Sequence, residues 1–373
     1  MKFTILSSDF SQALLPISKV IPQKAALPIL ENVLLCLEGN TLTLKGSDQE
    51  TTLITTITVE GETENGCIAV PAALITNIFK ELPGLQVKFE TIETRSLLSL
   101  TWSSGNTCLP FVVADEYPEL PALEENSPEI KIKGSILAES LNGVLYATSD
   151  EPLRPVMNGI YFDIKEDMTN FVASNAQKLV CIEREDVTGP KSSFILPKKP
   201  AMILKNYLTK FANEFVSITF DKKNAFFRFG EQVVACRLIE GVYPNYSAVI
   251  PKNNGFILTL SKNDLLNATK RVAVCANQAT GQIILKVGAT QVEITSQDLD
   301  LSTSAKERID CTYEGEPMTI AFKSQMLIEI LSNLPSEKIC IKLAAPNKAA
   351  LVQPAEQIDE NQNIFALLMP MRL

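Results

Sequence analysis

The sequence contains no histidine among its 373 residues. Histidine is the commonest general base and the commonest metal ligand in proteins. Its absence excludes nucleophile systems of the Ser-His-Asp and Cys-His kinds, and it excludes zinc sites that require an imidazole. Metal sites made of carboxylates stay open, although the chain has no calcium loop of the DxDxDG type.

Long apolar runs and closely paired cysteines are also missing. No stretch of 18 apolar residues occurs, so the sequence predicts no membrane span. The N-terminus has no long apolar core or cleavage site, and we interpret it as a first strand and helix rather than a signal peptide. The eight cysteines are scattered without a CxxC pair. This distribution favours reduced thiols in a cytoplasmic protein, with disulfides as the less favoured alternative.

The common phosphate-binding and nucleophile motifs are absent as well. The chain contains no GxGxxG, GxxxxGK[ST], GxSxG or HExxH segment. Acidic pairs such as Glu124 and Glu125 fall in expected loops, where solvated charges are the ordinary interpretation. An enzyme that acts through buried carboxylates stays an alternative, but no residue supports it.

Internal repetition organises what is present. The dipeptide Tyr-Pro at residue 117 recurs at residue 243, which is 126 residues later. Val70 precedes one amphipathic segment, and Leu196 precedes a similar segment at the same offset of 126 residues. A third such segment starts near residue 322. The sequence therefore predicts three divergent copies of one domain.

Each copy shows the same order of periodic segments. An amphipathic helix with apolar residues at three- and four-residue spacing comes first, and alternating strands follow it. A second helix and a further set of strands complete the copy. This order predicts an α+β fold with antiparallel sheets and few helices. Pro-containing polar stretches at 121–132 and 249–256 place the domains at 1–126, 127–250 and 251–373.

Charge is distributed unevenly over the three copies. Residues 1–126 carry 7 Lys and Arg against 16 Asp and Glu, whereas residues 127–250 carry 15 against 14 and residues 251–373 carry 12 against 13. Basic residues recur on equivalent expected helices, such as Lys80, Lys198 and Lys323. They are either ordinary solvated helix faces or one basic face for sequence-independent phosphate contact.

A set of short segments in a fixed order carries a family resemblance. The segments MKFTI, LPILENVLL, VPA, MNGIYFD, YPNY and the terminal MPMRL together resemble the β subunit of bacterial DNA polymerase III, the sliding clamp. The resemblance covers the whole chain. It implies clamp domains with two inner helices and outer antiparallel sheets, and a head-to-tail homodimer that closes a six-domain ring around double-stranded DNA.

The resemblance also implies partners and functional residues. The partners are the DNA polymerase III α subunit, an ATP-driven clamp loader and other proteins with a clamp-binding motif, while no catalysis, cofactor, metal or membrane is implied. The implied DNA-facing residues are Lys24, Lys80, Arg154, Lys198, Lys199 and Lys323. The implied peptide pocket consists of Met157, Ser174, Leu179, Pro244, Val249, Met369, Pro370, Met371 and Arg372. The implied dimer contacts are Thr107 and Leu109 against Val274 and Cys275.

Three expectations depend on this assignment. Pro370 ends strand pairing, so that the last residues are expected to turn freely toward the neighbouring domain. An acidic exterior with a basic bore is expected to keep DNA inside the ring. The stretch from Asn175 to Leu179 departs from the family pattern, as do Ala73 and Met326, so that the resemblance assigns no contact role to Gln177 or Lys178.

A second class of function stays open beside the ring. Three repeats without a catalytic motif also suit a non-ring scaffold that binds proteins only. The mass in solution, together with retention on circular but not on linear DNA, distinguishes the two.

Overall fold

The computed structural model describes residues 1–373 and contains two compact units. The first unit comprises residues 1–138 and 199–238, and the second comprises residues 139–198 and 239–373. Each unit contains a part of the predicted middle copy. No helix has the length and apolar character needed to cross a bilayer.

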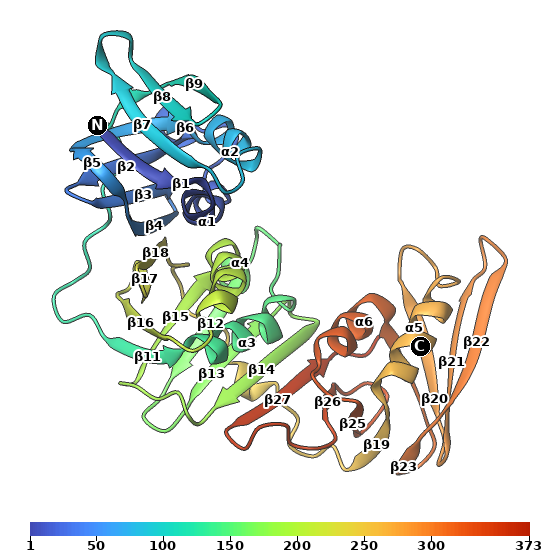
Figure 1. Ribbon diagram of the computed structural model, residues 1–373. Helices are drawn as coiled ribbons and strands as arrows, with labels where there is room; N and C mark the ends of the chain where they lie inside the picture. The colour runs from blue at the N-terminus through green and yellow to red at the C-terminus, as the bar shows by residue number, and fades with distance from the viewer. The chain divides into compact units, whose positions relative to one another are not determined.

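The first copy begins with a strand, a helix and a set of strands (Figure 1). Its elements are β1 Lys2–Leu6, α1 Ser7–Ser18, η1 Pro28–Glu31, β2 Asn32–Glu38, β3 Thr41–Ser47, β4 Thr51–Thr58, β5 Glu60–Glu64, β6 Gly66–Pro71, α2 Ala72–Lys80, β7 Gln86–Ile92, η2 Glu93–Arg95, β8 Leu97–Trp102, β9 Gly105–Pro110 and β10 Val112–Val113.

The middle copy repeats this order, which the sequence predicted from its periodic segments. Its elements are β11 Glu129–Lys133, α3 Gly134–Leu145, η3 Pro155–Met157, β12 Gly159–Ile164, β13 Thr169–Ser174, β14 Lys178–Arg184, β15 Ser192–Pro197, α4 Lys198–Tyr207, η4 Leu208–Phe211, β16 Phe215–Phe220, β17 Asn224–Phe229, β18 Gln232–Arg237 and η5 Tyr246–Ala248.

The third copy follows the same plan once more. Its elements are β19 Phe256–Ser261, α5 Lys262–Ala273, β20 Gln282–Val287, β21 Gln291–Asp298, β22 Thr303–Asp310, β23 Thr312–Glu314, β24 Met318–Lys323, α6 Ser324–Asn333, β25 Lys338–Leu343, β26 Ala350–Pro354 and β27 Gln362–Leu368. The predicted three-copy α+β architecture is therefore confirmed.

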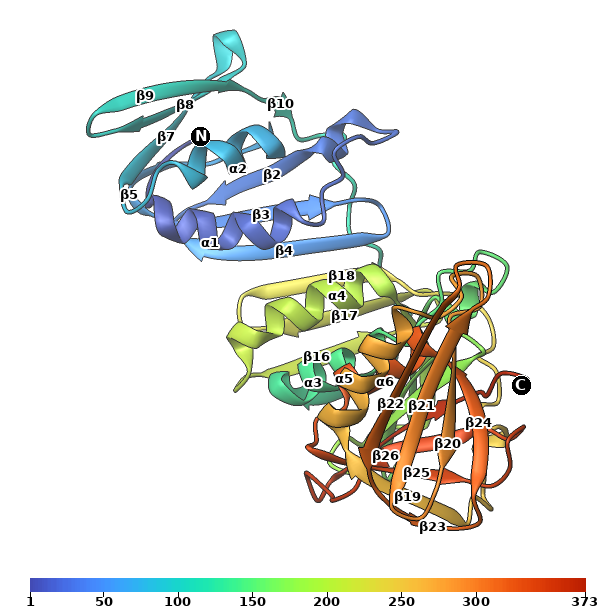
Figure 2. The same cartoon turned by 90° about the vertical axis from the view of Figure 1, so that its right-hand side faces the viewer.

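Pairs of helices cover one face of the sheets in the first and third copies. In the first copy α1 lies beside α2 (Figure 2), and Phe10 of α1 stands 4.5 Å from Phe79 of α2 and 4.9 Å from Phe89 of β7, measured between ring centroids. In the third copy α5 packs on α6 and buries Leu265 and Val272. Apolar burial of this kind, at about 25 cal/mol per Å², holds each helix pair on its sheets.

Two sheets continue from one copy into the next. In the first unit β4 pairs with β18, so that Leu53 lies opposite Val234 within a nine-stranded sheet. In the second unit β14 pairs with β27, so that Leu179 lies opposite Leu367 within another nine-stranded sheet. Backbone hydrogen bonds therefore join the copies, and the predicted cuts near 126 and 250 stay predictions.

Two strands that correspond to these junction strands, β9 in the first copy and β22 in the third, are edge strands with no neighbour on one side. Strand β9 closes one side of the five-stranded sheet β5-β1-β7-β8-β9, and β22 closes one side of the four-stranded sheet β22-β21-β20-β24. In copy order, β9 corresponds to β18 and β27, and β22 corresponds to β4 and β14. The chain thus carries one open edge of each junction type.

One cysteine pair differs from the prediction of reduced thiols. Cys36 of β2 and Cys67 of β6 lie directly opposite each other and form a disulfide, with their Cα atoms 4.1 Å apart. The other six cysteines are free. A separation of 31 residues gave no sign of this pairing, because only the β2–β6 register brings the two thiols together.

Gly134 at the start of α3 offers a test of this packing. A Cβ atom at this position would lie 2.3 Å from the carbonyl oxygen of Phe211. We expect Gly134→Ala to lower the free energy of unfolding by about 1–3 kcal/mol, because the backbone must move to relieve the overlap. Gly255→Ala is the matched control, since a Cβ there meets nothing within 4 Å. Equal denaturation midpoints for the two variants would contradict this packing.

Candidate functional site

Residues of the predicted peptide pocket lie on both sides of the junction between β14 and β27 in the second unit. Leu179 of β14 and Leu367 of β27 belong to one buried apolar cluster with Tyr243 and Phe365. Val156, which precedes the predicted pocket residue Met157, packs against the same cluster, and so does Ile250, which follows Val249. The structure therefore brings Leu179 and the chain neighbours of Met157 and Val249 to one apolar cluster from three distant parts of the chain.

The segment 239–250 forms one wall of this neighbourhood and is held by two tyrosines. The ring of Tyr243 stacks on Tyr161, with centroids 4.6 Å apart and an interplanar angle of 3°. The hydroxyl of Tyr246 donates to Asp163 Oδ2 at 2.6 Å and accepts from Asn170 Nδ2 at 2.7 Å. Burial and the bond to Asp163 raise the pKa of Tyr246, which therefore stays neutral. Pro244 and Val249 remain exposed on this fixed wall.

The turn between β13 and β14, with the start of β14, contains the stretch from Asn175 to Leu179 that departs from the family pattern. Asn175 Oδ1 accepts the N–H groups of Gln177 and Lys178, at 3.1 and 2.9 Å. Ser174 Oγ, at a buried position, donates to the carbonyl of Lys178 at 2.9 Å. Ala176 has a φ of 71°, a conformation that an L side chain adopts rarely. The turn is thus closed by its own side chains, with Gln177 exposed at its tip.

Lys178 has a structural role that the sequence did not reveal. Its side chain is only 4% exposed, and its ammonium group donates to the carbonyl oxygen of Tyr146 at 2.9 Å. The same ammonium forms an ion pair with Glu329 of α6 and lies 5.3 Å from the centroid of the Tyr146 ring. Lys178 therefore ties α6 to the strand that carries Leu179. Only the buried position of β14 could have indicated this role.

The C-terminal residues are held rather than free, which corrects the expectation for the segment after Pro370. The N–H of Met369 donates to Gln177 O at 2.9 Å and continues the β14–β27 ladder. The N–H of Met371 donates to Ala321 O of β24 at 2.8 Å, and Gln282 Nε2 donates to Arg372 O at 2.9 Å. The β14–β27 ladder ends at Pro370, and Met371 then bonds to the edge strand β24. Met369 remains exposed while Met371 is half-buried.

Five of the six predicted DNA-facing residues fall into two groups. Lys24, Lys80 and Arg154 are exposed, and Lys80 contacts only Asn77 in a long bond of 3.4 Å. Lys198 and Lys199, at the start of α4, are instead paired with carboxylates. Lys198 binds Asp150 at 2.6 Å.

The Lys199 ammonium binds Asp48 and the carbonyl of Val20. Pairing with local carboxylates reduces the positive charge that these two lysines present, and the sequence could not show it because Asp48 lies 151 residues away.

Lys198 and Lys323 share a polar hollow in the second unit. The hollow measures about 590 Å³, and Tyr146, Asp150, Lys178, Lys198, Lys323 and Glu329 contribute to its lining. Its three carboxylates, those of Asp150, Glu151 and Glu329, balance the charge of its three lysines. Hence the structure brings two predicted basic residues together, but in an environment of mixed charge.

The predicted dimer-contact residues differ in how far their side chains are exposed. Leu109 of β9 is 0% exposed and belongs to the core of the first copy, so its side chain cannot contact a second chain; this corrects its assignment. Alternation along the strand turns Cys108 outward instead. Thr107 is half-buried. Val274, after the end of α5, is 83% exposed, and Cys275 beside it is half-buried.

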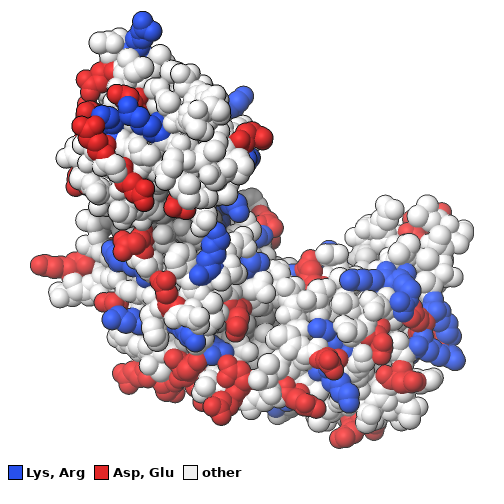
Figure 3. Space-filling model, viewed as in Figure 1, with Lys and Arg blue, Asp and Glu red and all other residues white.

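One patch on the third copy is basic, while the expected acidic exterior of the ring stays a prediction. Figure 3 shows Lys and Arg gathered over β21 and β22. Lys306 and Arg308 lie 2.7 and 2.9 Å from the carboxylate of Glu293, and Lys286 lies 3.8 Å from it. The first two cations lower the pKa of Glu293 to about 2. Three basic side chains around one carboxylate leave a positive excess in the cluster around Glu293.

Comparison with known proteins gives matches along the whole chain. Family models described as the DNA polymerase III beta subunit match in three parts: the N-terminal domain at residues 1–121, the central domain at 131–245 and the C-terminal domain at 247–372. The beta sliding clamp of Synechococcus elongatus is 27% identical over 384 residues and covers 100% of both chains. The beta sliding clamp of Vibrio cholerae is 25% identical, again with 100% of both chains covered.

Solved structures agree with this result. A DNA polymerase III subunit beta sliding clamp from Bartonella birtlesii superimposes with a TM-score of 0.93 at 27% identity, and 100% of both chains is covered. The corresponding clamp from Pseudomonas aeruginosa gives a TM-score of 0.94 at 24% identity, which supports the fold. With three matching domains in the family's order and full-length relatives, the chain belongs to the beta sliding clamps, the beta subunits of DNA polymerase III.

Proposed function

We propose that two copies of this chain join head to tail into a ring that encircles duplex DNA and tethers the replicative polymerase. The observation that carries this proposal is the pair of open edges on β9 and β22. Within the chain, strands of the β4 type join strands of the β18 type at both junctions, β4 with β18 and β14 with β27. The same rule joins β22 of one molecule to β9 of another.

The direction of the backbone N–H and C=O groups along the two open edges supports this contact. Cys311 N–H donates to Thr290 O. Because the backbone groups of successive residues point to opposite sides of a strand, this bond means that the odd-numbered residues of β22 form the hydrogen bonds with β21. The even residues Ser304, Lys306 and Arg308 then point their backbone groups to the open edge. On β9, Phe111 N–H donates to Ser96 O, which leaves the backbone groups of Cys108 facing its open edge. Each edge therefore offers a row of unpaired donors and acceptors to the other.

The partners follow from the same proposal. The ring works without catalysis of its own, in the cytoplasm, on the DNA that the polymerase copies. A loader opens it, and the polymerase α subunit and other proteins dock a short motif with Gln and Leu or Phe anchors against Leu179, Pro244, Val249, Met369 and Met371. Unbranched methionine side chains support this role, since they adapt to differently shaped apolar anchors.

Ser304→Pro tests the ring closure. Proline at this position removes an N–H that faces the open edge, and edge strands tolerate such a change within the monomer. We expect weaker dimers, because each intermolecular hydrogen bond contributes about 0.5–1.5 kcal/mol and the pyrrolidine ring also clashes with the incoming strand. Sedimentation at several concentrations measures the dissociation constant, and Ser304→Ala is the control that keeps the N–H. A wild-type chain that stays monomeric at micromolar concentration would favour the non-ring scaffold instead.

DNA contact is tested with the three exposed cations of the predicted set, Lys24, Lys80 and Arg154, which have no carboxylate partner in the structure. Replacing all three with Gln should weaken retention on nicked circular DNA after loading. Each lost phosphate contact lowers the salt slope of binding by about 0.9. The control variant replaces Lys131 and Lys133, two exposed residues of β11, with Gln. If both variants show the wild-type slope, the assignment of the DNA-facing residues is wrong.

Removal of residues 369–373 tests the peptide pocket. We expect the affinity for a peptide with Gln, Leu and Phe anchors to fall at least tenfold, which corresponds to about 1.4 kcal/mol. Calorimetry measures the affinity, and the melting temperature reports the loss of the tail's bonds to Gln177, Ala321 and Gln282. A chain that lacks only Leu373 is the matched control. Unchanged affinity in the folded, truncated dimer would place the pocket elsewhere.

A further inference from the structure

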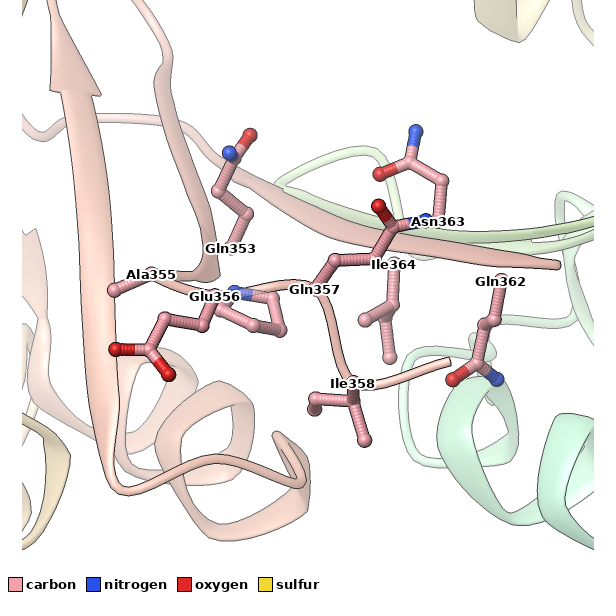
Figure 4. A pocket seen from close by; sticks show the side chains of 9 residues that line it. Gln353, Ala355, Glu356, Gln357, Ile358, Gln362, Asn363 and Ile364 are labelled. Atoms are coloured by element: carbon pink, nitrogen blue, oxygen red, sulfur yellow. The ribbon is translucent and has the colours of Figure 1, made fainter. Parts of the chain in front are cut away.

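The first copy exposes two cysteines whose side chains have no role in the proposed function, Cys67 of β6 and Cys108 of β9. The hollow of about 320 Å³ at the β26–β27 loop offers no comparable group, since amide side chains line most of it (Figure 4) and it has no cysteine, serine or lysine. The two exposed cysteines differ in their cross-strand neighbours. Cys67 lies opposite Cys36, whereas Cys108 lies opposite Ser99.

The register of the sheet holds Cys36 and Cys67 together, independently of the bond between them. Strand β2 pairs with β6 without interruption from Asn32 to Leu37. Directly opposite residues of an antiparallel pair place their side chains on the same face. The Cα atoms of the two cysteines are 4.1 Å apart, which is closer than the spacing of about 4.5–5.5 Å usual for opposite residues. The two sulfur atoms are therefore neighbours in the bonded state and in the reduced state.

The cysteine pair lies on the solvent face of this sheet. Along β2 the side chains alternate, so that Leu35 and Leu37 are buried and Cys36 between them is half-buried on the other face. Cys67 is exposed, and the neighbouring strand β10 pairs only with Ile68–Ala69 and ends before it reaches Cys67. A reagent in solution can therefore reach the Cys67 sulfur, while the Cys36 sulfur is less accessible.

We propose that Cys36 and Cys67 form a reversible thiol–disulfide exchange site, which small disulfides such as glutathione disulfide oxidise and dithiols reduce. Exposed disulfides exchange readily, whereas structural ones resist reduction. The sheet does not need the bond, because the β2–β6 ladder and the buried leucines on the opposite face hold the two strands in both states. Exchange therefore modifies the outer surface of the first copy and leaves its core intact.

Oxidation proceeds in two exchange steps. The Cys67 thiol loses its proton to solvent, and the thiolate attacks one sulfur of glutathione disulfide and expels one glutathione thiolate. The Cys36 thiolate, formed in the same way, then attacks the Cys67 sulfur of this mixed disulfide and expels the second glutathione. Two protein thiols become one disulfide while one glutathione disulfide becomes two glutathione molecules. A dithiol reverses both steps and becomes a disulfide itself. Cys108 can complete only the first step, because Ser99 opposite it has no thiol.

The test uses the full-length chain in glutathione buffers of varied ratio, and differential alkylation with peptide mass mapping assigns the state of each cysteine. The ratio of bonded to free Cys36–Cys67 should follow the concentration of glutathione disulfide divided by the square of the glutathione concentration, because an intramolecular disulfide releases two glutathione molecules. Dithiothreitol should reduce the pair completely without denaturant, and the circular dichroism of the chain should stay unchanged. The oxidised chain should unfold at a higher urea concentration than the reduced chain, since the cross-link constrains the unfolded state.

Cys36→Ser removes the thiol that completes the reaction. We expect at least tenfold more mixed disulfide with glutathione at Cys67 in this variant than in the wild-type chain. Cys108→Ser is the matched control and should leave the titration of Cys36–Cys67 unchanged. A pair that dithiothreitol reduces only after unfolding would be a structural cross-link and would overturn the proposal. So would a wild-type pair that stays free or retains glutathione at every buffer ratio, and so would an unmodified Cys67 in the Cys36→Ser variant.

Discussion

Backbone pairing across the boundaries between copies is the constraint on which the rest of this molecule depends. A ladder of main-chain hydrogen bonds needs no particular side chains, so three copies that have diverged in sequence can keep the same junction. The β14–β27 junction also creates the candidate peptide pocket, because it places Leu179 beside Leu367 and brings the C-terminal methionines to the turn at Gln177. The proposed assembly and the proposed partner binding thus rest on the same kind of contact.

Side chains make the second junction specific. At the second junction, Lys178 is buried between the β14 turn and α6 and is neutralised by Glu329, and Arg184 at the other end of β14 is neutralised by Asp186 and Asp359. A buried cation with its partner removed is costly, so these pairs favour one register over slipped ones. The pocket wall has a similar support in Tyr246, whose hydroxyl is bonded on both sides.

Much of the fold could be predicted from the sequence, because periodicity and a fixed offset are local or repetitive signals. The order of helices and strands and the three copies were predictable in this way. The pairing of Lys199 with Asp48 was not, nor was the disulfide between Cys36 and Cys67, since both depend on register between distant segments. Leu109 was placed on the correct strand but on the wrong face, because one residue of shift inverts a strand. The attachment of the tail to β24 lacked any sequence signal.

Because each junction joins two different kinds of strand edge, the number of copies in one polypeptide affects how it can assemble. A single copy set free would carry both edge types, and a heterologous contact that does not close extends into a filament. Fusing three copies in one chain satisfies two of the three junctions within the molecule and leaves only one unpaired edge of each type. Covalent linkage therefore lowers the number of separate contacts that the proposed ring requires to one per chain, and the rotation at that contact decides between a closed ring and a filament.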